Sequence, residues 1–130
     1  VNWLGWRRKL ELLYPALDAL ALTSFDEGTP VAVLEALAAG TPVVARAVGG
    51  VPEILEGVPT ATLVAEGTPE ALARELGRTL GRVPEERYLP EIVEAVRAEA
   101  AGSFSAERLA KDVEALYEEE LRKAGLLDST

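Results

Sequence analysis

The sequence predicts an α/β fold in which a parallel sheet is flanked by helices. A strand (18–24) leads through a loop into an apolar helix (31–39), and a second strand (42–45) follows at once. A last short strand (61–64) precedes a further helix. Strands that alternate with helices pair in parallel, and the connecting helices cover both faces of the sheet.

The chain begins with a predicted strand and a predicted helix. Residues 1–5 suit a short strand that ends at a glycine, and residues 6–14 have a helical apolar pattern that Pro15 and Asp18 interrupt. The basic run from Arg7 to Lys9 has two open interpretations, a solvated helix start or a group that meets a phosphate.

The helix over 31–39 has clear signals at both ends. Thr29 is a favourable N-cap, and Pro30 suits the first helical position. Gly40 can supply the left-handed residue just past the helix end. Glu35 is the only polar residue in this helix, and an apolar surface all round indicates burial. Its carboxylate therefore needs a partner or a ligand.

The first turn of this helix predicts an anion site. Free backbone N–H groups are expected at Val31, Ala32 and Val33, and the helix dipole adds positive potential there. Gly28 allows the preceding loop to come close to a ligand. Glu35 lies four residues after Val31 on the same face, where a carboxylate can accept hydrogen bonds from the two hydroxyls of a ribose.

Glu27 lies just before the helix, at the carboxyl end of a predicted strand, where open α/β sheets bind ligands. It would face the other end of the same ligand. A structural interpretation stays open for both acids: Glu27 caps the loop, and Glu35 lies on a solvated helix face.

The second half of the chain is mainly helical. The pair Gly49-Gly50 permits backbone conformations closed to other residues, and a short helix follows it. Thr68-Pro69 repeats the helix-start pattern of Thr29-Pro30. Helices are predicted over 69–80, 85–101 and 105–123.

Composition excludes several function classes. The 130 residues include neither cysteine nor histidine, so a disulfide framework, a histidine base and an imidazole metal site are excluded within this chain. The net charge of −9 argues against nucleic-acid binding and against unaided binding to anionic lipid. No apolar run has membrane-spanning length, so a cytoplasmic setting is expected. Arginine outnumbers lysine, and glutamine and methionine are missing, which suits a thermophile.

Several segments match one known family in order. Glu27 and Glu35 are separated by seven residues and are followed by residues 36–45 and then 48–53. Trp3-Leu4-Gly5-Trp6, residues 18–24 and Phe104-Ser105 extend the match over nearly the whole chain. This arrangement resembles the C-terminal lobe of the retaining, nucleotide-sugar-dependent glycosyltransferases with the GT-B architecture of two facing Rossmann-like domains.

The resemblance implies a Rossmann-like parallel sheet within an incomplete GT-B C-terminal lobe, with residues 1–130 forming one domain. It implies a nucleotide diphosphate-sugar as donor substrate, without a cofactor or metal, and an acceptor that the sequence does not identify. Glu35 would hold the ribose, and Glu27 would be the candidate catalytic residue, with positioning of the donor sugar as its safer role. The other implied donor-binding residues are Gly28, Thr29, Pro30, Val31 and Ala32.

The resemblance also places three segments outside the helix start. Gly5 and Trp6 would approach the nucleotide base, and the Gly49-Gly50 loop would lie on the donor side of the cleft. The apolar stripe of the last helix would also contact the N-terminal lobe; it comprises Leu109, Val113, Leu116 and Tyr117.

Compared with the family, the acceptor-binding N-terminal lobe and the first two strand–helix units of the C-terminal lobe are missing. Those units carry the Arg/Lys pair that clamps the donor diphosphate. The strand at 1–4 would then lack its neighbours, so we expect a fragment, a sheet completed by another chain, or rearranged pairing. The isolated chain is expected to be inactive. Two alternative functions remain, a nucleotide-sugar epimerase and a non-catalytic interaction module.

Overall fold

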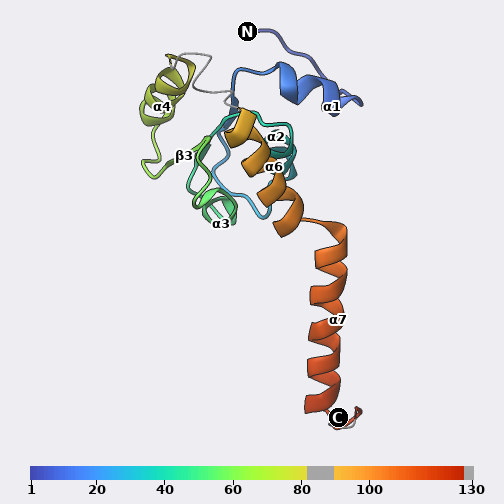
Figure 1. Ribbon diagram of the computed structural model, residues 1–130. Coiled ribbons are helices and arrows are strands. Elements are labelled where there is room, and N and C mark those ends of the chain that lie inside the picture. Colours follow the sequence, from blue (N-terminus) through green and yellow to red (C-terminus); the bar gives the residue numbers. More distant parts are fainter. Residues whose placement is uncertain (82–89, 128–130) are drawn as a thin grey trace.

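The centre of the protein is a parallel sheet of three short strands (Figure 1). The computed structural model describes residues 1–81 and 90–127. The strands are β1 (Leu20–Leu22), β2 (Val43–Arg46) and β3 (Ala61–Val64), in the spatial order β1-β2-β3. Their first residues pair side by side, so the carboxyl ends of all three strands lie at one edge. The predicted α/β fold with a parallel sheet is confirmed.

Helices cover both faces of the sheet. The described helices are α1 (Leu10–Leu13), α2 (Val31–Ala38), α3 (Val51–Leu55), α4 (Pro69–Gly81), α6 (Pro90–Ser103) and α7 (Ala106–Lys123), with a 3₁₀ turn η1 (Tyr14–Ala16) directly after α1. The helix predicted over 85–101 is described from Pro90 onward, and its earlier residues lie outside the described ranges.

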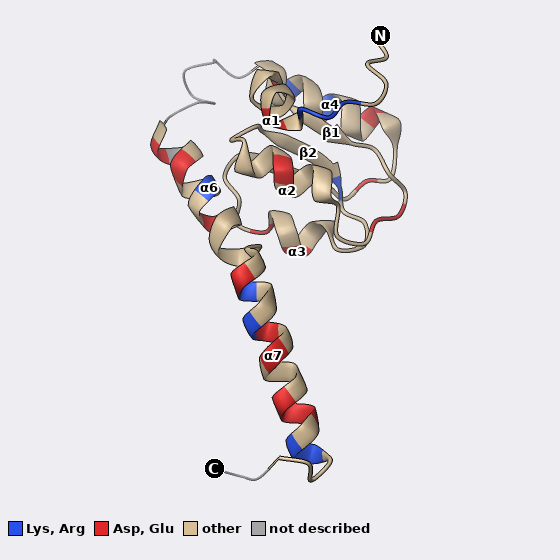
Figure 2. Ribbon diagram, turned by 90° about the vertical axis from the view of Figure 1, so that its right-hand side faces the viewer, with Lys and Arg blue, Asp and Glu red and all other residues tan. Residues whose placement is uncertain are grey.

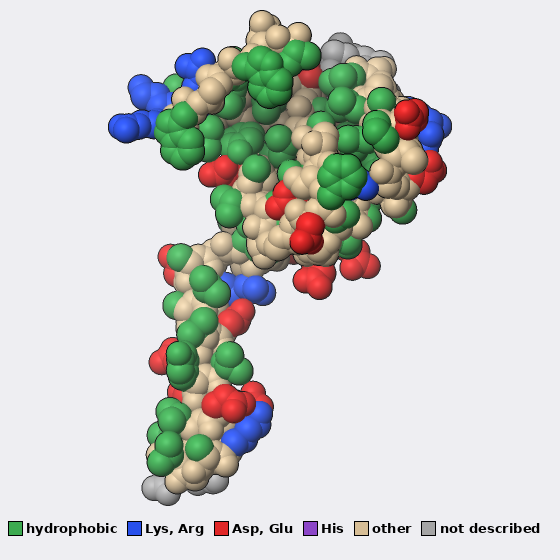
Figure 3. Space-filling model, turned by 180° about the vertical axis from the view of Figure 1, so that it is seen from behind, with side chains coloured by type: hydrophobic (Ala, Val, Ile, Leu, Met, Phe, Trp, Pro, Cys, Tyr) green, Lys and Arg blue, Asp and Glu red, His purple; other side chains and the backbone are tan. Residues whose placement is uncertain are grey.

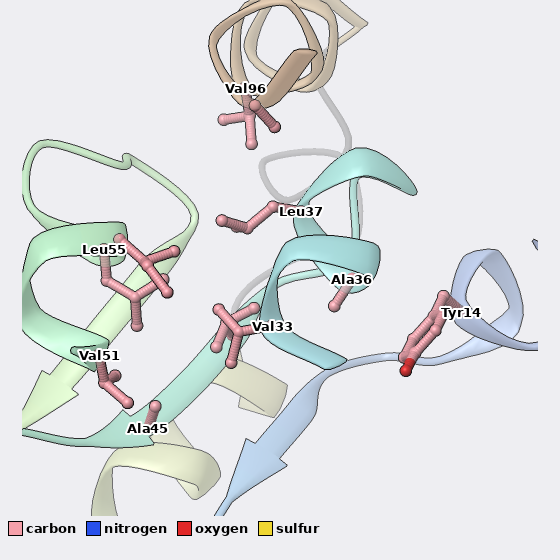
Figure 4. Packing of buried hydrophobic residues seen from close by; sticks show 11 residues of the cluster. Tyr14, Val33, Ala36, Leu37, Ala45, Val51, Leu55 and Val96 are labelled. Carbon is pink, nitrogen blue, oxygen red and sulfur yellow. The ribbon is translucent and has the colours of Figure 1, made fainter. Parts of the chain in front are cut away.

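The alternation of β2 explains why both faces are covered. Val43 and Ala45 are fully buried in the larger core, which α2, α3 and α6 complete. Val44 points the other way, into a smaller core with Ala71 and Leu72 of α4. A strand buried on both faces is typical of a parallel sheet between helix layers. Figure 4 shows the larger core, in which side chains of α2 and α3 meet above β2.

Helix α6 lies over the carboxyl end of α2. Val96 enters the larger core, and the Arg97 Nη2 donates a hydrogen bond of 3.1 Å to the Ala39 carbonyl. Gly40 has φ +75°, so the predicted left-handed residue is confirmed. A Cβ at Gly40 would lie 2.5 Å from the Val93 Cγ1, so this position also requires glycine for the close packing of α6.

The N-terminal segment differs from the sequence prediction. No strand forms over residues 1–5, whose side chains are exposed. None of the described strands runs beside this segment, and a single strand has no partner for its backbone groups. The predicted helix over 6–14 is also shortened to Leu10–Leu13. Three consecutive positive charges, from Arg7 to Lys9, oppose the helix dipole at this end and account for the late start.

The start of α2 is a second correction. Thr29 was expected to cap the helix, but Pro30 occupies the N-cap in an extended conformation, and no side chain caps the helix. Helix α4 follows the prediction, because the Thr68 hydroxyl accepts a hydrogen bond of 3.2 Å from the Ala71 N–H.

Helix α7 projects away from the rest of the chain (Figure 1). Acidic and basic residues are interleaved along it (Figure 2), and pairs such as Arg108–Asp112 and Arg122–Glu118 bridge successive turns. All its residues are exposed, including the apolar stripe predicted for it (Figure 3). The expected contact of this stripe with another lobe stays a prediction. No helix in the described ranges could span a membrane.

Candidate functional site

Three loops meet at the carboxyl edge of the sheet. They follow β1, β2 and β3 over residues 23–30, 47–50 and 65–68. Arg46, the last residue of β2, connects the outer two. Its guanidinium lies 4.2 Å from the centre of the Phe25 ring, and its Nη2 donates a hydrogen bond of 3.0 Å to the Gly67 carbonyl.

The Gly49-Gly50 pair packs directly against the loop that carries Glu27. The Gly50 N–H donates a hydrogen bond of 3.1 Å to the Gly28 carbonyl, and a Cβ at Gly50 would lie only 2.5 Å from that oxygen. Gly49 has φ +52°, and a Cβ there would overlap the Glu27 carbonyl. The predicted need for unusual backbone conformations is confirmed at Gly49, and the close backbone approach is a further reason for both glycines.

The first turn of α2 presents two open amides at this edge. The N–H groups of Val31 and Ala32 have no hydrogen-bond acceptor among the described residues. The Val33 N–H, in contrast, donates to the Pro30 carbonyl at 3.0 Å. The expectation of three free amides is therefore wrong for Val33. Pro30 is the N-cap in an extended conformation, and its carbonyl accepts the first hydrogen bond of the helix. Two donors and the positive end of the dipole remain for an anion.

Glu35 is partly buried and has a specific partner. Its Oε2 accepts a hydrogen bond of 2.9 Å from the Tyr14 hydroxyl, which comes from η1. The fully solvated interpretation of Glu35 is therefore wrong. The Glu35 carboxylate also lines a cavity of about 510 Å³ between α1, α2 and α6. The described lining residues are Arg8, Leu10, Glu11, Tyr14, Pro15, Glu35, Ala38, Ala39 and Arg97.

The predicted site residues fall into two groups. Glu27 is half-buried in the loop at the carboxyl edge, with Gly28 and Thr29 exposed beside it and Pro30 buried beneath. The Glu27 side chain has no hydrogen-bond or ion-pair partner among the described residues, so it does not cap the loop. None of the described residues that line the Glu35 cavity comes from this loop. Glu27 thus lies before the start of α2 and Glu35 lies within the helix, and a ligand reaching both must run along α2.

Tyr14 was missed as a site residue. Its sequence pattern marked only an apolar helix face, whereas the side chain is 8% exposed and bonds to Glu35 through its hydroxyl. A usable signal was present, because a buried tyrosine hydroxyl needs a partner and the lone carboxylate of α2 needs one as well. Arg8 and Arg97 also line the cavity, and Arg8 belongs to the basic run for which the sequence allows a phosphate contact.

The Tyr14 phenol is held in its neutral form. Burial raises the pKa of the Tyr14 phenol to about 12, and the hydrogen bond to Glu35 and the charge of that carboxylate act in the same direction. Tyr14 therefore remains a hydrogen-bond donor throughout the neutral range.

Comparisons with known proteins identify the chain's relatives. The family model described as "Glycosyl transferases group 1" matches residues 1–82. The D-inositol 3-phosphate glycosyltransferase of Salinispora tropica is 37% identical over 110 residues, which are 85% of this chain and 22% of that protein. The protein with the same name from Salinispora arenicola is 34% identical over 89% of this chain and 25% of its own length.

A relative with lower sequence identity is also named a glycosyltransferase. An uncharacterized glycosyltransferase of Methanocaldococcus jannaschii is 31% identical over 83% of this chain and 27% of its own length. This chain thus spans roughly a quarter of the length of the curated relatives it matches. The family model and these relatives agree with the resemblance found in the sequence, and the chain belongs to the group 1 family of glycosyltransferases.

Proposed function

We propose that this chain supplies the donor-binding lobe of a retaining glycosyltransferase that uses a nucleotide diphosphate-sugar. The observation that carries the proposal is the arrangement on α2. Two open amides stand at its first turn, and a partly buried carboxylate that opens into a cavity follows one turn later. A diphosphate and a ribose are neighbouring groups of one ligand, and this spacing suits them.

The first step of the proposal concerns the leaving group. The N–H groups of Val31 and Ala32 donate hydrogen bonds to the diphosphate and stabilise the negative charge that develops on it as the glycosidic bond breaks. Because they are fixed by the helix, they need no reorganisation during the reaction. Such preorganised donors can contribute several kcal/mol to transition-state stabilisation, about 3 kcal/mol for a single donor.

The second step concerns the rest of the donor. Glu35 accepts hydrogen bonds from the ribose hydroxyls, and its cavity receives the nucleoside side of the ligand. Glu27 and the backbone from Gly28 to Pro30 position the donor sugar at the other end. The contact between Gly28 and the Gly49-Gly50 pair supports this role, because it holds the loop close to the sheet edge.

The acceptor and the remaining diphosphate contacts are proposed to come from sequence beyond these residues, because the chain matches about a quarter of its relatives. The purified 130-residue chain should then bind a donor without transferring its sugar.

Calorimetry tests the binding step. We expect the chain to bind at least one of UDP, GDP and ADP, and Glu35→Ala to weaken that binding by about tenfold or more, as for loss of a hydrogen bond to a charged group. Glu75→Ala is the matched control, because Glu75 is a carboxylate of α4 that bonds Arg74 and Arg78 on the surface. Equal affinity of the wild-type chain and Glu35→Ala would contradict the ribose assignment, and an inert interaction module would bind none of the three nucleotides.

A further inference from the structure

Tyr14 is tied to α2 at two points. Its hydroxyl donates to the Glu35 Oε2 at 2.9 Å, and its carbonyl accepts a hydrogen bond of 2.6 Å from the Thr41 Oγ1. Thr41 is 1% exposed and lies just past the carboxyl end of α2. The Tyr14 ring packs in the larger core, and Figure 4 shows it directed toward α2 near Ala36. The position of the ring is thus set by its packing in the larger core, and the Thr41 bond holds only the Tyr14 backbone.

This arrangement restrains a side chain that is otherwise flexible. A glutamate has three rotatable bonds, and ordering them on ligand binding costs conformational entropy. The hydrogen bond from Tyr14 orders the carboxylate in advance. Each carboxylate oxygen can accept two hydrogen bonds, and the Glu35 Oε1 has no partner among the described residues. Acceptor positions for two hydroxyls are therefore still open on the Glu35 carboxylate, and Glu35 lines the cavity.

We propose that Tyr14 is a positioning residue that aims the Glu35 carboxylate at two neighbouring hydroxyls of the ligand, the ribose diol. This inference rests on the proposed function and adds to it the origin of ribose selectivity. Tyr14 exerts this effect through Glu35. The neutral phenol suits this role, because burial and the nearby carboxylate raise the pKa of Tyr14 to about 12 and the donor proton is retained.

The alternative is that Tyr14 only stabilises the fold. A structural defect would weaken binding of ribonucleotides and 2′-deoxyribonucleotides by the same factor. If Tyr14 orients the Glu35 carboxylate, losing that orientation would weaken ribonucleotide binding selectively, because the 2′-deoxy ligand lacks one of the hydroxyls that Glu35 holds. The ratio of the two affinities therefore separates the explanations.

The experiment compares UDP, GDP and ADP with their 2′-deoxy forms by calorimetry, using Tyr14→Phe and, as the control, Thr41→Val. Tyr14→Phe removes only the hydroxyl, and Thr41→Val removes the other hydrogen bond of Tyr14 while leaving the phenol beside Glu35. The wild-type chain should prefer the ribonucleotide by about tenfold. Tyr14→Phe should bring this preference below about threefold, and Thr41→Val should keep it.

Two outcomes overturn the inference, and they are distinguishable. A wild-type preference that persists in Tyr14→Phe removes the positioning role and leaves the proposed function intact. A wild-type chain that binds no nucleotide, or binds both forms equally, overturns the ribose assignment and this inference together.

A second measurement follows the hydrogen bond without any ligand. In a chain with Tyr88→Phe and Tyr117→Phe, ultraviolet absorbance reports the ionisation of Tyr14 alone. Its phenol should titrate near pH 12, and Glu35→Gln should move the midpoint toward the ordinary value of about 10. A Tyr14 phenol that titrates near pH 10 with Glu35 intact overturns the inference.

Discussion

Helices α2 and α4 pack on opposite faces of β2, and a Thr-Pro pair precedes each of them. In α4 the Thr68 hydroxyl accepts a hydrogen bond from the Ala71 N–H, and the Thr68 carbonyl accepts one from the Leu72 N–H. In α2 the equivalent Thr29 makes no such bond, and Pro30 becomes the N-cap. The Ala32 amide, the counterpart of Ala71, stays open as a result, next to the open Val31 amide.

The difference arises from contacts far away in sequence. The loop before α2 is held by the Gly49-Gly50 turn, whereas the loop before α4 meets the rest of the sheet edge through the Arg46 side chain. A side-chain cap is worth about 1 kcal/mol, so a well-packed backbone contact can displace it. A helix start that is held open against its local preference is a reason to look for a ligand.

The largest predicted effect concerns the contact that keeps α2 open. Gly49→Ala should lower the free energy of unfolding by more than about 3 kcal/mol, because alanine would be strained at the positive φ of this position and its Cβ would overlap the Glu27 carbonyl. Urea unfolding measures the change. Gly77→Ala in α4 is the control, since a Cβ there meets nothing and should stabilise the helix by about 0.5–1 kcal/mol. Equal urea midpoints for the two variants would contradict the packing described for Gly49.

The next largest effect is a pH dependence of stability that arises from the hydrogen bond to the Glu35 carboxylate of α2, and the Glu75 carboxylate of α4 is the comparison. Glu35 is bonded by a buried phenol, whereas Glu75 of α4 is bonded by exposed arginines. The pKa of Tyr14 is raised above its unfolded value of about 10, so the stability linked to it is present below pH 10 and is lost as pH rises through about 12. The full loss is about 3 kcal/mol for a shift of two units.

Urea unfolding between pH 9 and pH 12 tests this linkage. The difference in stability between the wild-type chain and Tyr14→Phe should shrink or reverse over that range. A difference that stays constant with pH would show that the phenol titrates normally.

A smaller effect separates the two threonines. Thr68→Ala should cost about 1 kcal/mol, because it removes a side-chain cap from α4. Thr29→Ala should change stability by less than about 0.3 kcal/mol, because the exposed Thr29 caps nothing. Thermal unfolding of both variants is sufficient, and equal losses would mean that Thr29 caps α2 in solution.

The smallest effect is expected at the surface of α4. Arg78→Ala removes an exposed ion pair of 2.8 Å with Glu75 and should cost less than about 0.5 kcal/mol. The cost should fall further in 1 M NaCl, where charges are screened. A loss of 2 kcal/mol that persists in high salt would contradict this, because it would mean that the Arg78–Glu75 pair is shielded from solvent as the Tyr14–Glu35 hydrogen bond is.

The sequence was sufficient for the elements whose signals are local. The strands and helices between residues 18 and 81 follow from alternating apolar segments and from turn residues, and Gly40 was correctly predicted at the end of α2. The failures share one cause. Residues 1–5 form no strand because none of the described strands pairs with them. Thr29 does not cap α2, because the Gly49-Gly50 contact holds the loop before the helix. Both outcomes depend on segments that are distant along the chain.

The candidate site divides in the same way. The sequence by itself showed that a lone acid in an apolar helix needs a partner and that the chain resembles a glycosyltransferase lobe, and it predicted an anion site at the helix start. Only the tertiary structure decided that Tyr14, 21 residues away, is the partner of Glu35, and that two amides stay open while the third is filled. Apolar periodicity and caps act within one or two helical turns, whereas a hydrogen bond between α2 and η1 exists only after the core has brought them together.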